Sequence, residues 1–267
     1  EDKQVPFAVE RQLDQIAKGV DVIVAALEQE GRLFYVGAGT SGRLGILDAS
    51  ECPPTFGTPP ELVQGVIAGG PSAMVKAVEG AEDCAELGRA DVQAHGVTDR
   101  DVVVGIAASG RTPYVIGALR EAQAIGARTI SLSCNQNALI NEGVDVAINV
   151  VVGPEVLAGS TRLKAGTAQK LVLNMLSTAS MVRLGKVYGN LMVNVQGTNK
   201  KLQERVKRII MEVTGISYAE AETLAALADG DAKTAILMRL TGTTKEEACR
   251  LLKVTRGKIR EALEQFG

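Results

Sequence analysis

Short apolar runs alternate with amphipathic stretches through the first two thirds of the chain. Runs this short and this continuously apolar are typical of strands that are buried on both faces of a parallel sheet. We expect strands at 32–36, 62–68, 101–107, 128–133 and 144–152. Helical patterns follow the second run through about Gly88 and recur at Tyr114–Ile125 and Lys164–Leu184. The pattern predicts an α/β fold, with a doubly wound five-stranded parallel sheet and flanking helices.

The segment before the first strand, from Val5 to about Glu28, has the periodicity of a single helix. Its apolar residues recur at steps of three and four, namely Val9, Leu13, Ile16, Val20, Ile23 and Leu27. A stripe of this kind either lines the core or forms a contact between subunits.

After about residue 197 the strand pattern stops and helical patterns continue. Ser217 with Glu220, and Thr244 with Glu247, have the spacing of helix capping boxes, and the two pairs begin 27 residues apart. These features predict a small all-helical accessory domain. We expect three parts, an N-terminal helix at 1–30, the sheet domain at 31–197 and the helical domain at 198–267.

Composition and charge narrow the possible functions. Apolar residues make up 46% of the 267 residues and charged residues 22%, which is ordinary for a globular protein. The net charge of −2 argues against a general binder of nucleic acid or of anionic membranes. No run of about 18 uncharged apolar residues could span a bilayer. Because the chain starts with Glu1 rather than Met, we expect further residues to precede it.

Four cysteines and one histidine leave little scope for a metal or redox centre. The cysteines are scattered without a C-x-x-C pair, at Cys52, Cys84, Cys134 and Cys249. Zinc sites and redox dithiols need closer spacing or more imidazoles. We therefore expect small buried thiols in a reducing cytosol, no metal and no cofactor.

A turn rich in glycine and hydroxyl groups follows the first predicted strand. Gly37–Gly42 (GAGTSG) matches the G-x-G-x-x-G pattern of dinucleotide sites, but no Asp or Glu closes the second strand to hold a ribose. Gly39 and Gly42 let the backbone approach a ligand, and Thr40 and Ser41 add hydroxyls near a helix start. We expect these residues to bind a phosphate monoester or a sugar hydroxyl. A tight turn without a ligand is the alternative.

A similar turn, at 108–113 (ASGRTP), follows the third predicted strand. Ser109, Gly110 and Thr112 form a second candidate cradle for an anion. Arg111 either pairs with the phosphate or lies on the surface. Because the carboxyl ends of parallel strands share one edge of a sheet, we expect the two turns to bind one ligand.

A third turn of this kind, Gly159–Thr167 (GSTRLKAGT), leads into the long predicted helix. Ser160 and Thr161 either line the same cleft or serve only as N-caps of that helix.

The three turns resemble those of the sugar isomerase (SIS) fold family, which binds phosphosugars. Longer stretches are similar to the N-acetylmuramic acid 6-phosphate etherase family, namely Gly37–Thr55, Glu79–Asp83, Gly105–Tyr114 and Lys164–Ser177. The resemblance spans nearly the whole chain. One departure from SIS isomerases is Ala107, which stands where they usually carry a serine. Ser41, Ser109 and Thr112 are therefore left to bind more of the phosphate.

The resemblance implies a cytoplasmic lyase of cell-wall sugar recycling that needs no cofactor. Such an enzyme cleaves the D-lactyl ether at C3 of the phosphosugar and leaves N-acetylglucosamine 6-phosphate and D-lactate. Once the ring opens, the C1 aldehyde makes the C2 proton acidic. A base removes this proton, an acid protonates the departing lactate, and water then adds at C3. The reaction needs two proton-transfer groups.

The resemblance also implies a homodimer in which the partner subunit completes the cleft. The first helix, with its apolar stripe, and the helix at Lys164–Leu184 are the candidates for the contact between subunits.

Two glutamates are the candidates for the proton-transfer groups, because the one imidazole, His95, sits before a helix-to-strand turn. The catalytic glutamates of the etherase family correspond to Glu51 and Glu82. By that resemblance Glu51 protonates the lactate and later activates water, and Glu82 is the base at C2. The acid must hold a proton near neutral pH, which requires a buried environment.

The surroundings of these glutamates predict where they lie. Glu51 comes just before Pro53 and Pro54, which we expect to end its helix. Both Glu51 and Glu82 are then expected to reach the carboxyl edge of the sheet. Glu79 is an alternative candidate to Glu82. Glu155, beside the third turn, is a second alternative, which would bind a sugar hydroxyl.

Three other functions fit parts of the sequence. Residues 246–263 have the spacing of a helix-turn-helix, and a DNA-binding phosphosugar sensor is one possibility. Six Lys and Arg against four Asp and Glu in 241–267 make a weak footprint for DNA. A second is a non-catalytic regulatory protein, since relatives of the etherases include a sugar-phosphate-responsive kinase regulator. A third is an aldose–ketose isomerase, which would need no acid for lactate.

Overall fold

The computed structural model describes residues 1–195 and 200–266, and the chain divides into two compact units. One unit comprises Glu1–Glu51 with Pro60–Ser180, and the other comprises Cys52–Pro59 with Met181–Gly267. The second unit thus takes in a short segment from within the expected sheet domain. The boundary that the sequence suggests at 197/198 falls at 196–199, outside the described residues.

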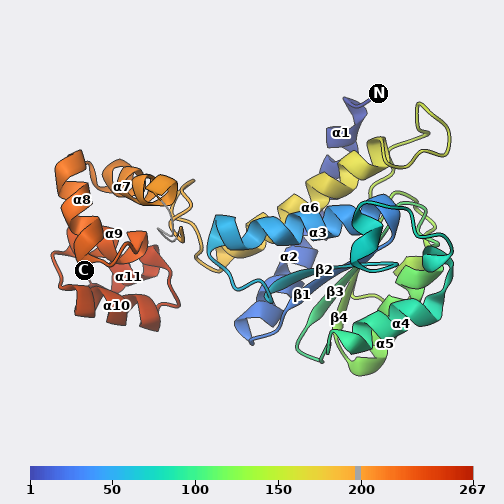
Figure 1. Ribbon diagram of the computed structural model, residues 1–267, viewed down its shortest axis with the longest axis horizontal. Coiled ribbons are helices and arrows are strands. Elements are labelled where there is room, and N and C mark those ends of the chain that lie inside the picture. The colour runs from blue at the N-terminus through green and yellow to red at the C-terminus, as the bar shows by residue number, and fades with distance from the viewer. Residues whose placement is uncertain (196–199, 267) are drawn as a thin grey trace. The chain divides into compact units, whose positions relative to one another are not determined.

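The first unit is built on a five-stranded parallel sheet in the order β2-β1-β3-β4-β5 (Figure 1). Its strands are β1 (Leu33–Gly37), β2 (Val63–Ile67), β3 (Val102–Ala107), β4 (Arg128–Ser133) and β5 (Val146–Asn149). Every residue of the central strands β1 and β3 is buried, as their continuous apolar runs predict. The predicted fold class is confirmed, although β5 is shorter than expected.

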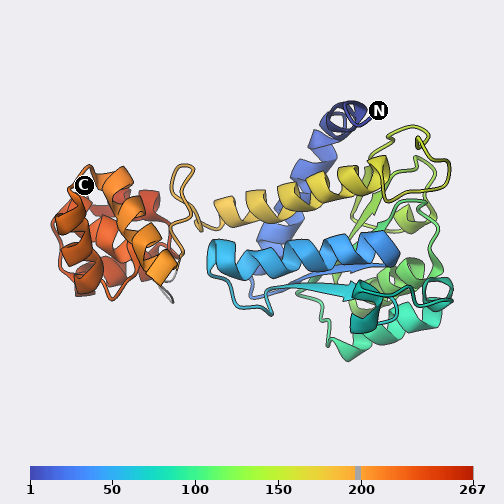
Figure 2. The same ribbon diagram turned by 45° about the horizontal axis from the view of Figure 1, so that its top comes forward.

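Helices cover both faces of this sheet (Figure 2). One face carries α2 (Leu13–Glu28), α3 (Gly39–Phe56) and α6 (Lys164–Arg183), and the other carries α4 (Ala85–Ala94) and α5 (Pro113–Ile125). On the first face Gly45 of α3 lies so close to Tyr35 of β1 that no larger side chain would fit. On the second face α4 and α5 enclose an apolar core that includes Phe34 of β1 and Val103 of β3.

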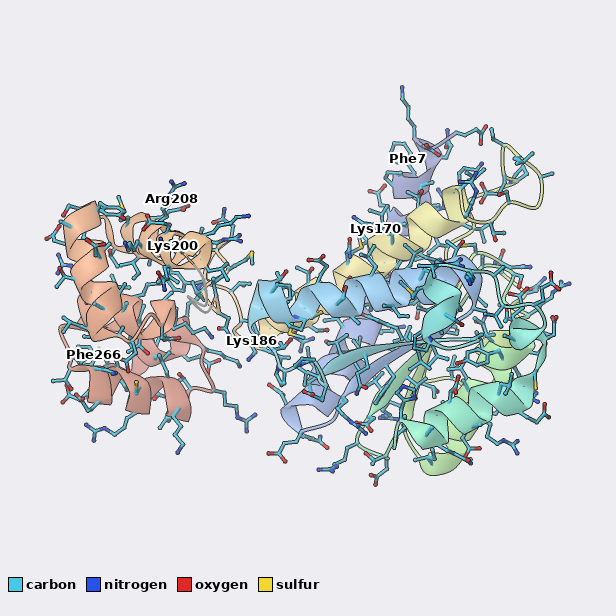
Figure 3. The ribbon with its side chains drawn as sticks, viewed as in Figure 1. Phe7, Lys170, Lys186, Lys200, Arg208 and Phe266 are labelled. Carbon is cyan, nitrogen blue, oxygen red and sulfur yellow. The ribbon has the colours of Figure 1, made fainter. Side chains whose placement is uncertain are left out.

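The N-terminal segment forms two helices, α1 (Gln4–Glu10) and α2, rather than the single helix expected. Leu13, at the break, is 47% exposed, whereas Ile23 in the middle of the apolar stripe is completely buried. α2 packs against β3 and β5. The stripe therefore lines the core of this chain, apart from Leu13. Phe7 of α1 is an exposed apolar side chain in this region (Figure 3).

The segment between β2 and α4 is not the helix that the sequence pattern suggests. It contains only two short 3₁₀ helices, η1 (Pro71–Met74) and η2 (Ala81–Asp83). Gly69 and Gly70 have φ angles of 85° and 70°, which no residue of a right-handed helix adopts. α4 begins only at Ala85.

α3 does not end before Pro53, as expected, but continues to Phe56. Each proline removes one helical N–H donor, so other contacts must hold the last turn. Cys52 and Phe56 are buried, at 2% and 6% exposed, and the N–H of Gly57 donates to the carbonyl oxygen of Pro53 at 2.9 Å. Burial of these side chains outweighs the missing donors. Glu51 therefore lies within a helix.

The second unit is helical in its C-terminal part. Its helices are α7 (Lys200–Thr214), α8 (Tyr218–Leu227), α9 (Ala232–Thr241), α10 (Lys245–Val254) and α11 (Ile259–Phe266). Ser217 and Thr244 form the predicted capping boxes at the starts of α8 and α10. Cys249 is exposed, so the expectation of a buried thiol is wrong there. No helix in the described part of the chain is long and apolar enough to cross a membrane.

Candidate functional site

Two of the glycine- and hydroxyl-rich turns lie side by side at the carboxyl edge of the sheet. β1 and β3 are neighbours, and Gly37 pairs with Ile106 near their carboxyl ends. The chain leaves β1 into α3 on one face and leaves β3 into α5 on the other. This is the topological switch point of the sheet, which is the place where open α/β sheets bind ligands.

The first turn presents backbone N–H groups as well as hydroxyls. α3 begins at Gly39, whose φ is 52°, and the N–H of Gly42 donates to the carbonyl oxygen of Ala38 at 3.2 Å. The N–H groups of Thr40 and Ser41 precede the first intrahelical bond, so they are open to an anion. The half-buried Thr40 lies at the edge of this turn.

Ser41 is tied to the long helix α6. Ser41 is buried, with 7% of its surface exposed, and its hydroxyl donates to Oε1 of Gln169 at 3.0 Å. The Nε2 of Gln169 is buried and has no hydrogen-bond partner among the described residues. Gln169 stands 128 residues from Ser41 in the chain, and no local pattern in the sequence pointed to it.

The second turn is built around Gly110. Its φ is 69°, and a Cβ atom there would lie 2.3 Å from Cβ of Ala138, so only glycine fits. The hydroxyl of Ser109 accepts the N–H of Arg111 at 3.2 Å and keeps its own proton free to donate. Thr112 is the N-cap residue of α5, but its side chain makes no capping hydrogen bond. Arg111 is exposed.

The third turn joins the first through the start of α6. Gly166 lies against Thr40, with its Cβ position 3.4 Å from Cγ2 of the threonine, and its N–H donates to the carbonyl oxygen of Thr161 at 2.9 Å. Ser160 is half-buried, and neither its hydroxyl nor that of Thr161 caps α6. The cap is instead the carboxylate of Glu155.

Glu155 accepts the N–H groups of Lys164 and Ala165, each at 2.9 Å. A carboxylate at a helix N-terminus is stabilising, so Glu155 has a structural task at the start of α6. Lys164 is itself buried and forms an ion pair with Glu1.

A hollow of about 360 Å³ opens beside the first turn. Ala38 and Gly39 line it from the turn, and the segment 73–83 lines it from the other side. Glu82 of η2 is one of its lining residues and Glu79 is another. Both side chains are exposed. The structure thus brings Glu82 next to the first turn, together with its rival.

Glu51 is remote from this hollow within the same chain. α3 runs back along the sheet from Gly39, and Gly45 has already drawn level with Tyr35 of β1. Glu51 follows six residues later, about 9 Å further along the helix. The amino end of β1, Leu33, lies only two residues before Tyr35, or about 7 Å from it in the same direction. Glu51 is exposed beyond the amino end of β1. The expectation that it reaches the carboxyl edge is wrong, because the helix between Gly39 and Glu51 carries the chain back toward the amino edge.

A buried carboxyl group, which the sequence did not reveal, connects α3 to α6. Oδ1 of Asp48 accepts hydrogen bonds from Nδ2 of Asn174 at 2.6 Å and from the hydroxyl of Ser177 at 3.1 Å. Tyr35 is a further hydrogen-bond partner. Burial raises the pKa of Asp48 despite these hydrogen bonds. Together with Ser41 and Gln169, this network fixes the position of α3 against α6.

Two other titratable groups can be placed relative to the turns. His95 ends α4 at the amino edge of the sheet, where its carbonyl oxygen accepts a hydrogen bond from Arg32 at 3.4 Å. Cys134 follows β4, and its N–H donates to the carbonyl oxygen of Ala108 at 3.0 Å. Burial raises the pKa of the Cys134 thiol to about 12, so this thiol is no nucleophile. Within 1–195 and 200–266 no cluster of His, Cys, Asp or Glu could hold a metal ion.

Comparisons with known folds agree with this architecture. The family model described as "Glucokinase regulatory protein N-terminal SIS domain" matches residues 15–123, and the "SIS domain" model matches residues 82–179. Phosphoheptose isomerases from Neisseria gonorrhoeae and Francisella tularensis have similar structures. Each has a TM-score of 0.54 and 20% identity, and each match covers 67% of this chain and 92% of the isomerase. Likeness at this identity shows the fold alone.

Comparisons of sequence give much closer relatives, which are N-acetylmuramic acid 6-phosphate etherases. The protein from Geobacillus thermodenitrificans is 59% identical over 99% of this chain and 90% of its own length. That from Mycolicibacterium smegmatis is 58% identical over 98% of this chain and 88% of its own length. N-acetylmuramic acid 6-phosphate etherase 2 from Vibrio cholerae is 60% identical over 99% of this chain and 86% of its own length.

Proposed function

Because the chain belongs to the N-acetylmuramic acid 6-phosphate etherase family, we propose that it cleaves the D-lactyl ether of N-acetylmuramic acid 6-phosphate. The products are N-acetylglucosamine 6-phosphate and D-lactate, and one water is consumed. Identity of 58% to 60% along almost the entire chain carries this proposal. We place the reaction in the cytoplasm, where it would serve the recycling of cell-wall sugars without a cofactor.

The phosphate of this substrate suits the first two turns. α3 and α5 both begin there, and helix N-termini favour anions because their N–H groups point at the ligand. The hydroxyls of Thr112 and Ser109 are available as further donors. We assign the phosphate to Gly39–Gly42 and to Ser109, Gly110 and Thr112. Ser160 and Thr161 of the third turn would bind the sugar hydroxyls.

Glu82 is the group we assign as the base at C2. It lines the hollow that adjoins the first turn, so a sugar with its phosphate on that turn can extend toward it. After ring opening, Glu82 would take the C2 proton while the C3–O bond breaks and an acid protonates the lactate oxygen. Water would then add at C3 and a proton would return to C2. The added water supplies the C3 hydroxyl, and its other proton restores the acid that protonated the lactate.

Glu51, the proposed acid, must come from a second copy of the chain. About 18 Å of helix separates it from Gly39, so one chain cannot place both Glu51 and Glu82 at one sugar. We therefore propose a homodimer in which Glu51 of each copy completes the site of the other. Contact with the second copy would also supply the burial that the exposed Glu51 side chain lacks in a single chain.

The proposed reaction is tested by incubating the protein with N-acetylmuramic acid 6-phosphate in heavy-oxygen water. We expect D-lactate without heavy oxygen, and a sugar product that carries one heavy oxygen at C3. Glu82→Gln should release no lactate while still binding N-acetylglucosamine 6-phosphate. Heavy oxygen in the lactate would contradict elimination followed by hydration. A protein that binds the phosphosugar but releases no lactate would favour the non-catalytic regulator.

A further inference from the structure

Two cations without ion-pair partners line the hollow that holds Glu82. They are Arg43 of α3 and Lys76 of the segment that precedes η2. Neither side chain forms an ion pair with any residue in 1–195 or 200–266. Because neither cation is committed to a carboxylate of the protein, both can bind an anionic ligand in the hollow.

The backbone holds Arg43 in place. Its Nε donates to the carbonyl oxygen of Met74 at 3.0 Å, and the side chain is half-buried. This bond uses one of the five N–H groups of the guanidinium and leaves its two terminal nitrogens free. A guanidinium fork of this kind matches the two oxygens of a carboxylate. Lys76 lies two residues beyond Met74, and its ammonium group is exposed.

The substrate of the proposed reaction brings a second anion to this place. Besides the phosphate at C6, it has the carboxylate of the lactyl group, which is three bonds from C3. Glu82 acts on C2, and C3 is bonded to C2, so the lactyl group must lie in the same hollow. There it would meet Glu79, Glu82 and Asp83, which also line the hollow. Carboxylates of the protein and of the substrate repel each other within one hollow unless cations lie between them.

We propose that Arg43 and Lys76 bind the carboxylate of the lactyl group, and that this contact selects lactyl ethers over other sugar phosphates. The inference rests on the proposed function, because that function places a lactyl group next to Glu82. It assigns the two anions of the substrate to different parts of the site. The hydroxyls and N–H groups of the turns and helix N-termini bind the phosphate, and the two cations bind the carboxylate.

Lys76→Met is the more informative variant, because the exposed Lys76 side chain makes no hydrogen bond that the fold requires. Affinities are measured by calorimetry on the Glu82→Gln background, which binds without turnover. We expect Lys76→Met and Arg43→Gln to weaken binding of N-acetylmuramic acid 6-phosphate by about 10- to 100-fold, as for the loss of a charge-assisted hydrogen bond. Binding of N-acetylglucosamine 6-phosphate, which lacks the carboxylate, should change less than about twofold.

Two controls accompany these variants. Lys76→Arg should retain most of the affinity, and Lys18→Met, which removes an exposed lysine of α2, should leave both affinities unchanged. Equal weakening for both ligands would overturn the proposal, because the cations would then serve the phosphate. No weakening for either ligand would overturn it as well. Since these affinities do not depend on turnover, they remain decisive for the carboxylate contact even if the unmutated protein releases no lactate.

Discussion

The hydroxyl groups of the proposed phosphate site differ in what they already bind. Ser41 is buried and holds Gln169, whereas Thr112 makes no side-chain hydrogen bond at its N-cap position. The sequence predicts both as phosphate ligands, since each lies in a glycine-rich turn after a strand. It cannot show that Ser41 also has a partner 128 residues away, because that contact exists only once α3 and α6 are packed together.

Comparing Ser41→Ala with Thr112→Val separates a role in holding Gln169 from a role in binding the phosphate. We expect Thr112→Val to weaken binding of N-acetylglucosamine 6-phosphate by about tenfold or more, because a hydrogen bond to a charged group contributes about 1.5–3 kcal/mol. Ser41→Ala should weaken it less, because the hydroxyl proton of Ser41 is already donated to Gln169 and the backbone N–H is retained. Only Ser41→Ala should also lower the free energy of unfolding, by about 1–3 kcal/mol, since the buried amide of Gln169 loses its partner. Titration calorimetry and denaturant unfolding measure the two effects. Equal unfolding free energies for both variants would contradict the structural role of Ser41.

At the scale of elements, the strands could be predicted closely and the segments around the site could not. A run of buried apolar residues defines a strand whatever its neighbours are, and β4 spans the predicted residues 128–133. The end of α3 depended instead on Cys52 and Phe56, whose burial keeps the helix intact through two prolines. Glu51 lies at the other edge of the sheet for a separate reason, because twelve residues of continuous helix carry the chain from Gly39 back toward the amino ends of the strands.

The helical unit contains a buried lysine, and no sequence pattern predicts what it binds. Lys233 of α9 is buried at 7% exposed, and its Nζ donates to the carbonyl oxygens of Gly185 at 2.7 Å and Gly257 at 2.8 Å. Burial, with a smaller contribution from Lys186, lowers the pKa of Lys233 to about 8. One side chain thus joins α9 to the loops that follow α6 and α10.

This lowered pKa predicts a pH-dependent stability. Between pH 8 and 10.5 the unfolded chain binds one proton more than the folded one at this residue, so its contribution to the free energy of unfolding rises with pH and is lost as pH falls through 8. We expect the difference in unfolding free energy between the unmutated protein and Lys233→Met to rise by up to about 1.4 kcal/mol per pH unit in this range. Lys253→Met, at an exposed lysine of α10, should show no such slope. A flat or falling difference for Lys233→Met would contradict the assignment.

At the scale of the whole molecule, the two candidate catalytic glutamates impose a condition on assembly. Glu82 lines a hollow at the carboxyl edge of the sheet, and Glu51 lies beyond the amino end of β1. Resemblance to a family can assign roles to both residues, because roles follow from matching motifs. It cannot tell whether one chain brings them together, because that depends on the direction and length of α3. If both act on one sugar, two copies of the chain must share each site.

Mixed dimers test this condition directly. A dimer of one Glu51→Gln chain and one Glu82→Gln chain, purified through two different tags, has one site with both glutamates intact if each site is shared. It should have about half the activity of the unmutated dimer, whereas each variant alone should be inactive. If both glutamates acted within one chain, the same mixed dimer would be inactive.

The reciprocal mixture removes the remaining ambiguity. An unmutated chain paired with a chain that carries both Glu51→Gln and Glu82→Gln has no intact shared site, so it should be inactive. If the glutamates acted within one chain, this dimer would instead keep about half of the activity. The two mixtures have the same composition of glutamates and differ only in how these are distributed between the copies. Opposite activities therefore report the geometry of the site, independently of how strongly either substitution impairs the chemistry.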